Sequence, residues 1–184
     1  MNLVRNGIGA LLFGMFVVLS CGRGSLGREV EAFVGQRVVF PDSLQAVVGG
    51  RTVENLGLTD SAAKLVVWID SIGCTSCALQ HLDPWYEVTD YAGQVGQGFQ
   101  VVFLLSPKRA DRNTIGRSTM LFRYPMYVDR ESRFEALNPA VPKDSRLHVF
   151  LLDSANRVVL VGSPIGNPRL WELYKQQIEK LTGR

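Results

Sequence analysis

The chain has 184 residues, a formal net charge of +3 and apolar residues at 46% of its positions, which suits one globular domain with its own core. Charged residues make up 20% of the chain and the basic ones form no long run. The sequence therefore lacks the concentrated basic stripe that is typical of nucleic-acid-binding proteins, and we expect no nucleic-acid partner.

The N-terminus has the layout of a secretory signal. Arg5 supplies positive charge, and the apolar run IGALLFGMFVVL follows at residues 8–19. This run is shorter than the roughly 20 residues that a membrane-spanning helix needs. It ends at the small residue Ser20, directly before Cys21, as a cleavage site would. Such a signal has three possible outcomes: cleavage to a soluble protein, an uncut membrane anchor, or lipidation of Cys21.

The residues around the expected cleavage site are similar to a bacterial lipobox. In that motif the cysteine, here Cys21, becomes the lipidated first residue of the mature protein. We therefore expect a lipoprotein signal peptide at residues 1–20, a lipidated cysteine with a flexible glycine-containing tether at 21–33, and one folded domain at 34–184.

The remaining sequence predicts alternating strands and helices. Residues 65–69 (LVVWI) and 99–105 (FQVVFLL) are apolar runs that suit strands buried on both faces. The first elements expected are a strand at 37–40 that pairs with one at 45–48, the strand at 65–69, and a helix from Thr75 that restarts at Pro84. The strand at 99–105, a helix at about 108–121, a strand at 126–128 and a helical turn at 133–137 follow. The chain then ends with a hairpin of 147–152 and 157–161 and a final helix from Pro168.

This order predicts the α/β class, with a central mixed sheet flanked by helices, a C-terminal β-hairpin and a last helix. Asn167 is expected to cap the last helix. The apolar stripe of that helix consists of Leu170, Leu173, Tyr174, Ile178 and Leu181.

The three cysteines divide cleanly. If Cys21 carries lipid, only Cys74 and Cys77 remain, in a single C-x-x-C pair. One such pair does not make a disulfide-stapled scaffold, and closing so short a loop stabilises a fold little. We therefore interpret the pair as chemical rather than architectural.

The expected position of the pair, where a buried strand turns into a helix, favours thiol chemistry. Free backbone N–H groups and the positive end of the helix dipole stabilise a thiolate there and lower the pKa of the first cysteine from about 8.5. A thiolate is the attacking species in disulfide exchange. We assign Cys74 as the nucleophile and Cys77 as the resolving thiol.

Three stretches resemble a known family. Residues 64–82 (KLVVWIDSIGCTSCALQHL) resemble the strand–CxxC–helix of thioredoxin-like proteins. Residues 124–129 (YPMYVD) and 148–162 (HVFLLDSANRVVLVG) resemble the extra central strand and the hairpin of the exported TlpA/redoxin-like branch. The resemblance covers residues 34–181. It implies a thioredoxin-like fold and thiol–disulfide oxidoreductase or related activity in the cell envelope.

The sequence departs from this family at three places. The family usually has a cis-proline just before the hairpin strand, a place that falls here at 147–148, whereas Pro142 lies several residues too early. Gly73 stands where many members have tryptophan. Trp68 stands where thioredoxin has a buried acid, and Asp70 is the nearest carboxylate.

Among the two histidines and three tryptophans of the chain, one is a candidate for the site. His148 is a candidate auxiliary residue that could contact substrate, tune a thiol pKa or bind a metal; the alternative is a half-buried polar residue at the start of a strand. His81 is interpreted as a surface or packing residue, and Trp68, Trp85 and Trp171 as packing residues.

The sequence thus predicts a cell-envelope thiol–disulfide oxidoreductase that acts through Cys74 and Cys77, lipid-anchored on the periplasmic side. We expect protein thiol or disulfide substrates, a redox partner protein and no cofactor. The alternatives are a copper-binding protein, since two thiolates and the imidazole of His148 suit Cu(I), or a non-catalytic accessory lipoprotein. Thioredoxin-fold copper proteins usually space their cysteines C-x-x-x-C, which this chain does not.

Overall fold

The structure is a computed structural model that describes residues 24–54, 56–60, 62–70, 72, 82–107, 115–120 and 122–184. Several sequence predictions lie outside these residues: the signal peptide at 1–20, the lipidation site Cys21, the pair Cys74 and Cys77, and the helix from Thr75 with His81. No helix in the described part of the chain combines the length and apolarity needed to cross a bilayer.

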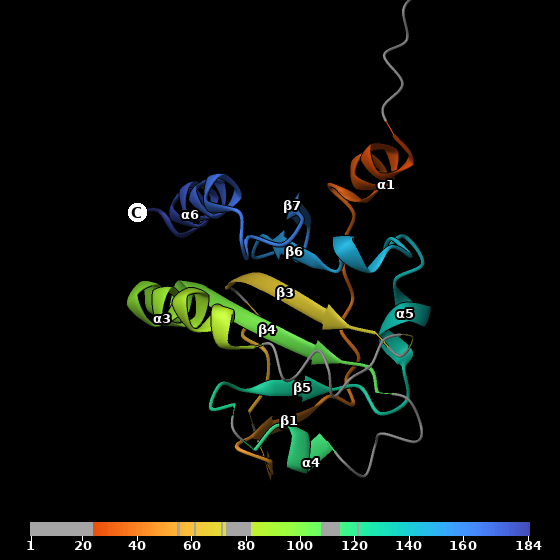
Figure 1. Ribbon diagram of the computed structural model, residues 1–184, viewed down its shortest axis with the longest axis vertical. Coiled ribbons are helices and arrows are strands. Elements are labelled where there is room, and N and C mark those ends of the chain that lie inside the picture. The colour runs from red at the N-terminus through yellow and green to blue at the C-terminus, as the bar shows by residue number, and fades with distance from the viewer. Residues whose placement is uncertain are drawn as a thin grey trace, which may run out of the picture.

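A mixed sheet of seven strands forms the centre of the domain (Figure 1). The strands lie in the order β2-β1-β5-β4-β3-β6-β7, with β3, β4 and β5 parallel and the other neighbours antiparallel. Their bounds are β1 Gln45–Val48, β2 Arg51–Val53, β3 Ala63–Ile69, β4 Phe99–Leu105, β5 Met126–Val128, β6 Val149–Leu152 and β7 Val158–Val161.

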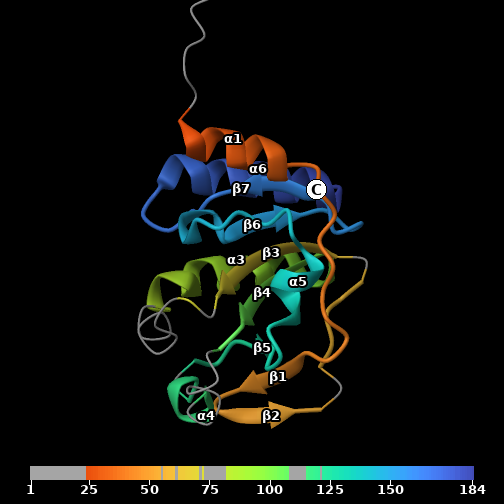
Figure 2. The same ribbon diagram turned by 90° about the vertical axis from the view of Figure 1, so that its right-hand side faces the viewer.

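Helices lie on both sides of this sheet (Figures 1 and 2). The long helices α3 and α6 pack on one face, and α5 and the end of α1 contribute to the other. The α-helices are α1 Ser25–Phe33, α3 Tyr86–Val95, α4 Ile115–Ser118, α5 Arg133–Leu137 and α6 Pro168–Thr182. Short 3₁₀ turns are η1 Asp83–Trp85, η2 Gly96–Gly98 and η4 Ser145–Leu147.

Strand β3 lies inside the sheet, between β4 and β6, and its alternate side chains enter two different cores. Leu65 and Val67 pack with α3 and α6 on one face. Val66 and Trp68 pack with α5 on the other. Both faces exclude water, which explains why the strand is a continuous apolar run rather than an alternating one. The predicted buried strand and α/β class are confirmed.

The strand predicted at residues 37–40 is wrong. Arg37 makes only an isolated bridge with Arg157, and the backbone of Val39 bonds to a side chain instead of a strand. Asn138 accepts from the Val39 N–H at 2.7 Å and donates to its carbonyl at 2.8 Å. Strand β1 pairs with β2 and β5, so its predicted pairing with 37–40 is also wrong.

Part of the segment predicted as a flexible tether, residues 21–33, is the helix α1 from Ser25 to Phe33. Phe33 at its end is buried and meets Phe150 edge-on, with ring centroids 5.1 Å apart. The segment therefore contacts the domain. The domain boundary at residue 34 stays a prediction.

The turn between β1 and β2 lies tightly against α4. Gly50 has φ +79°, and a Cβ added there would lie 2.4 Å from the carbonyl oxygen of Gly116. Only glycine fits both the backbone conformation and the space. The hairpin is thereby docked against the segment that precedes β5.

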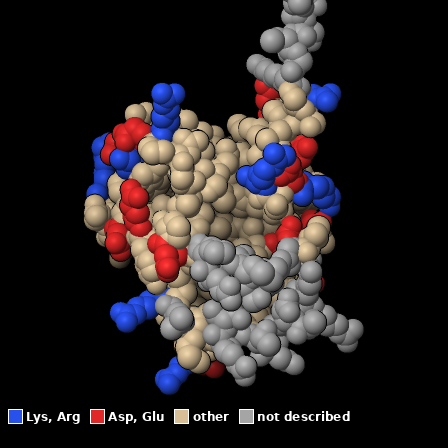
Figure 3. Space-filling view, in the orientation of Figure 1, with Lys and Arg blue, Asp and Glu red and all other residues tan. Residues whose placement is uncertain are grey.

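The final helix begins as predicted, because Asn167 Oδ1 accepts from the Leu170 N–H at 3.1 Å. Tyr174 and Ile178 are buried, whereas Leu181 at the end of the expected stripe is exposed. On the face of the molecule in Figure 3, acidic and basic side chains are interspersed around the periphery of the described part, and the described residues of the hollowed upper centre are uncharged.

Candidate functional site

The carboxyl ends of the three parallel strands carry a row of polar residues. Asp70, Ser106 and Asp129 are the first residues after β3, β4 and β5, and all three are buried. The Ser106 N–H donates to the Ile69 carbonyl at 2.9 Å, and the Asp129 N–H donates to Leu105 at 2.7 Å. The backbone ladder thus continues past the strands and holds these side chains at one edge.

The expected cysteine pair follows this edge in the sequence. Strand β3 ends at Ile69, five residues before Cys74, but Cys74 and Cys77 lie outside the described residues. Asp70 Oδ1 accepts from the Ile72 N–H at 3.0 Å and so orients the start of the connection. The strand half of the predicted strand–CxxC–helix is therefore present.

His148 lies beside Asp70 at this edge. Its side chain is only 4% exposed, more buried than the half-buried position that the sequence suggested. One ring nitrogen, Nε2, is 2.9 Å from the carbonyl oxygen of Pro142. The other, Nδ1, is 3.6 Å from Asp70 Oδ2. Both nitrogens of the imidazole thus face protein oxygen atoms.

This arrangement fixes how the imidazole of His148 carries its proton. The Pro142 carbonyl can only accept, so Nε2 must donate and the neutral ring has a lone pair at Nδ1. That lone pair faces the carboxylate of Asp70, with 3.6 Å between Nδ1 and Oδ2. Burial lowers the pKa of His148, while the Pro142 carbonyl and Asp70 oppose that shift.

Trp68 connects the histidine to the rest of the polar row. Its ring lies against the imidazole of His148, with centroids 4.2 Å apart and an interplanar angle of 37°. Its Nε1–H donates to Ser106 Oγ at 3.1 Å, and Ser106 Oγ is 3.4 Å from Asp129 Oδ2. Asp129 Oδ2 also accepts from the Phe134 N–H at 2.8 Å, which joins the row to α5.

The comparisons with known proteins bear on the fold alone. No protein-family model matches the chain, and no curated protein does. Solved structures match at low identity. A protein assigned as the thiol:disulfide interchange protein DsbE of Chlorobium tepidum has a TM-score of 0.51 at 16% identity, covering 81% of this chain and 99% of that one. A protein assigned to electron transport in Aquifex aeolicus VF5 also has a TM-score of 0.51, at 13% identity, covering 82% of this chain and 99% of that one.

These two matches cover 81% and 82% of the chain. The chain has a thioredoxin-like fold. Within this thioredoxin-like fold, the polar row lies at the carboxyl edge of parallel strands, where open α/β sheets commonly bind ligands.

The polar row at this edge includes residues and contacts that the sequence does not predict. The sequence predicts His148 as a candidate residue but not its contact with Pro142. Pro142 lies several residues before the place where the family has its cis-proline. The peptide bonds of the described residues are all trans. Ser106 and Asp129 were missed. Their one sequence signal is a polar residue placed directly after each buried strand.

The copper interpretation gains no support from His148, because both of its nitrogens face protein groups. Among the described residues no cluster of three or more histidine, cysteine, aspartate or glutamate side chains could hold a metal ion. A cavity of about 10 Å³ lies beside Trp68, Asp70 and His148, which is space for about one water molecule.

Proposed function

We propose that the protein is a thiol–disulfide oxidoreductase of the cell envelope that acts through Cys74 and Cys77. The observation that carries this proposal is the course of β3, a strand buried on both faces that ends five residues before Cys74 at an edge lined with buried polar groups. Neighbouring folds include a protein assigned as a thiol:disulfide interchange protein, which supports the same class of activity.

The proposed reaction exchanges one disulfide for another. The thiolate of Cys74 attacks a substrate S–S bond, forms a mixed disulfide and releases one substrate sulfur as a thiolate. Cys77 then loses its proton and attacks the sulfur of Cys74, which releases the second substrate thiolate. The substrate gains two electrons and the Cys74–Cys77 pair becomes a disulfide. A partner dithiol returns the pair to its reduced form by the reverse exchange.

The pair of Asp70 and His148 is proposed to accept the proton of Cys77. A resolving thiol must be deprotonated before it attacks. The Asp70–His148 contact is buried, and Asp70 precedes Cys74 by four residues in the sequence, so this contact can hold that proton and return it to the released thiolate. The chemistry of this edge then depends on the protonation state of His148.

Anchoring through Cys21 completes the proposal. A lipidated cysteine followed by α1 would hold the domain close to a membrane, where exported proteins with free thiols or disulfides are substrates. Mass spectrometry of the chain purified from a bacterial membrane fraction is the test. We expect cleavage before Cys21 with added lipid mass, and both to be lost in Cys21→Ser. A Cys21 without added mass would contradict the anchor.

The central test is the reduction potential of the cysteine pair, measured on a chain that begins at residue 22 and so keeps every described residue. After equilibration in graded thiol buffers, alkylation and mass spectrometry should reveal a reversible two-electron transition. Exchangers of this fold span about −270 to about −120 mV. A transition in that range supports the proposal.

Trapping identifies the role of each thiol. Cys77→Ser should accumulate a mixed disulfide with a disulfide-containing protein such as insulin, whereas Cys74→Ser should not. The reverse pattern would overturn the assignment. A pair that does not cycle, combined with tight one-to-one Cu(I) binding by the reduced chain, would overturn the proposed function itself.

A further inference from the structure

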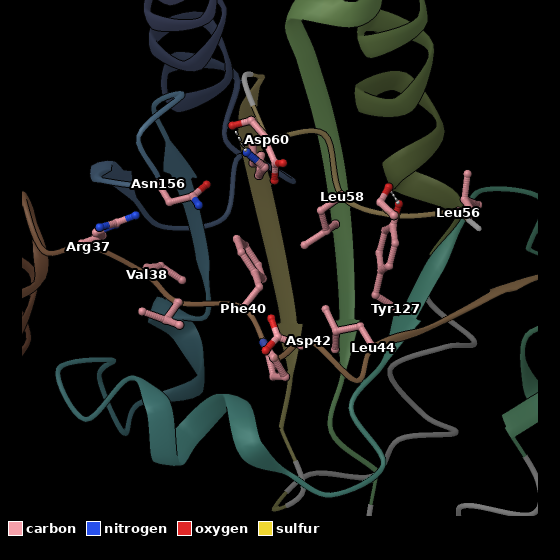
Figure 4. Close-up of a pocket in the computed structure, with 14 residues that line it drawn as sticks. Arg37, Val38, Phe40, Asp42, Leu44, Leu56, Leu58, Asp60, Tyr127 and Asn156 are labelled. Atoms are coloured by element: carbon pink, nitrogen blue, oxygen red, sulfur yellow. Dashed lines mark hydrogen bonds between the residues drawn. The ribbon is translucent and has the colours of Figure 1, made fainter. Parts of the chain in front are cut away.

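A cavity of about 360 Å³ lies on the sheet face opposite α3 and α6, at the start of β3 rather than at its end (Figure 4). Residues 37–44 and 56–60 form its walls, and side chains of β3 and β5 form its floor. Its volume lies within the range of small-molecule sites in proteins, about 300–1,000 Å³. The polar row that contains Asp70 and His148 takes no part in it.

Apolar side chains and polar groups both line the cavity. Phe40 projects into it from one covering segment and Leu58 from the other (Figure 4), and Val38 and Leu44 also line it. Tyr127 presents its ring from β5, while its hydroxyl is already used: it accepts from Gln100 and donates to the carbonyl of Gly57. The apolar part of a small amphipathic molecule would therefore find contacts here, beside the polar groups of the same lining.

A buried ammonium group lies at the floor. Lys64 is 1% exposed, although it carries a positive charge at neutral pH when solvated. Its Nζ donates to the carbonyl oxygens of Ala62 at 2.9 Å and Asp60 at 3.5 Å. An ammonium group has three protons to donate. Burial of such a charge is costly unless an opposite charge accepts from it.

Burial lowers the pKa of Lys64, and the more distant carboxylates of Asp60 and Asp153 oppose that shift. The other charged side chains that line the cavity, Arg37, Asp42 and Asp60, are exposed at its rim. Lys64 is thus the charged group that a ligand inside the cavity would meet away from water.

We propose that this cavity binds a small apolar molecule that bears a single carboxylate. Lys64 donates to the carboxylate, and Phe40 and Leu58 contact the apolar part. The rim carries two carboxylates, Asp42 and Asp60, against one guanidinium, Arg37, and this net negative charge disfavours a ligand with a second negative charge. The position of the cavity at the far end of β3 makes this binding independent of the proposed thiol chemistry.

Calorimetric titration with three eight-carbon compounds tests the proposal: octanoate, octanol and octylamine. We expect octanoate to bind most tightly at neutral pH, by about tenfold or more over octanol, which is the effect of one charge-assisted hydrogen bond. Lys64→Met should remove this preference and leave octanol binding unchanged. Lys180→Met, which removes an exposed lysine of α6, is the matched control and should bind as the native chain does.

A second variant tests the site without touching the charge. Leu58→Trp fills the cavity from its rim and should weaken octanoate and octanol alike. Octanoate that binds no more tightly than octanol to the native chain would overturn the proposal, as would equal octanoate affinity in Lys64→Met and Lys180→Met. Because Met replaces a buried charge by an apolar chain of similar length, Lys64→Met should fold at least as stably as the native chain.

Discussion

Nδ1 of His148 lies 3.6 Å from Oδ2 of Asp70 while Nε2 of the same ring is bonded to the Pro142 carbonyl. The two contacts together make the imidazole a fixed element of the edge where β3 ends. Because these surroundings are buried, they also set the pKa of His148, and the stability of the domain should therefore depend on pH.

The free energy of unfolding should decrease as the pH falls below about 6.5, because of His148. Burial lowers the pKa of this imidazole in the folded state, against the attraction of Asp70, Asp144 and Glu135, while in the unfolded chain the pKa is about 6.5. Below pH 6.5 the unfolded chain binds the proton more readily, so the contribution of His148 is complete above about pH 6.5 and is lost as the pH falls through the lowered pKa.

Urea unfolding at a series of pH values between about 7 and 5 measures this loss. The free energy of unfolding should decrease more steeply for the native chain than for His148→Gln, which cannot take up a proton. Parallel curves for the two proteins would show that His148 is not held neutral by its surroundings.

Trp68 should be more sensitive than the half-buried Trp171 to the same substitution. Trp68→Phe removes the buried Nε1–H bond to Ser106 and leaves a gap, at a cost of about 2 kcal/mol or more. Trp171→Phe removes an exposed bond to Glu87 and should cost less than about 1 kcal/mol. Chemical unfolding of both variants decides; equal costs would contradict a structural role for the Trp68–Ser106 bond.

Asn138 should hold the segment that contains Val39 on the domain. Its side chain makes three hydrogen bonds, two with Val39 and one with the Phe134 carbonyl at 2.7 Å. Asn138→Ala should cost about 2–4 kcal/mol and speed amide exchange across residues 37–41. Asn167→Ala removes a helix cap, should cost about 1 kcal/mol, and should leave exchange at 37–41 as it is in the native chain. Unchanged exchange in Asn138→Ala would contradict the anchoring role.

The turn between β1 and β2 offers a matched pair of glycines. Gly50→Ala forces a Cβ to within 2.4 Å of the Gly116 carbonyl oxygen at positive φ, and should cost about 2–4 kcal/mol in thermal or chemical unfolding. Gly49→Ala meets positive φ alone, with open space around the new Cβ, and should cost about 1 kcal/mol. If Gly49→Ala proved the more damaging, the close approach to α4 would be refuted.

The sequence predicts best the strands that are buried along their whole length on both faces of the sheet. Residues 99–105 and 126–128 form strands with the predicted bounds, because continuous burial on both faces leaves an unbroken apolar run. Residues 37–40 also have the pattern of a strand, yet the backbone of Val39 is hydrogen-bonded by the side chain of Asn138, 99 positions further along the chain. No local pattern reveals a side chain that arrives from so far along the chain.

The same reason limits what could be foreseen of the site. His148 was identified by residue type, but its partners Asp70 and Pro142 meet it only through the pairing of β3 with β6 and the loop before it. Lys64 precedes the predicted strand at 65–69, and the sequence does not single it out, because a lysine at the start of a strand usually reaches water. Its burial depends on the segments that cross over it.

The N-terminal segment between α1 and β1 also has a kinetic consequence. Gly35 and Val38 bond to the backbone of Val158 and Asn156, and Arg157 reaches back 122 positions to the Gly35 carbonyl. Contacts this distant in sequence slow folding, since a long loop must close before they form. The first and last parts of the domain therefore complete each other late, and a growing or translocating chain stays unfinished until its final hairpin has emerged.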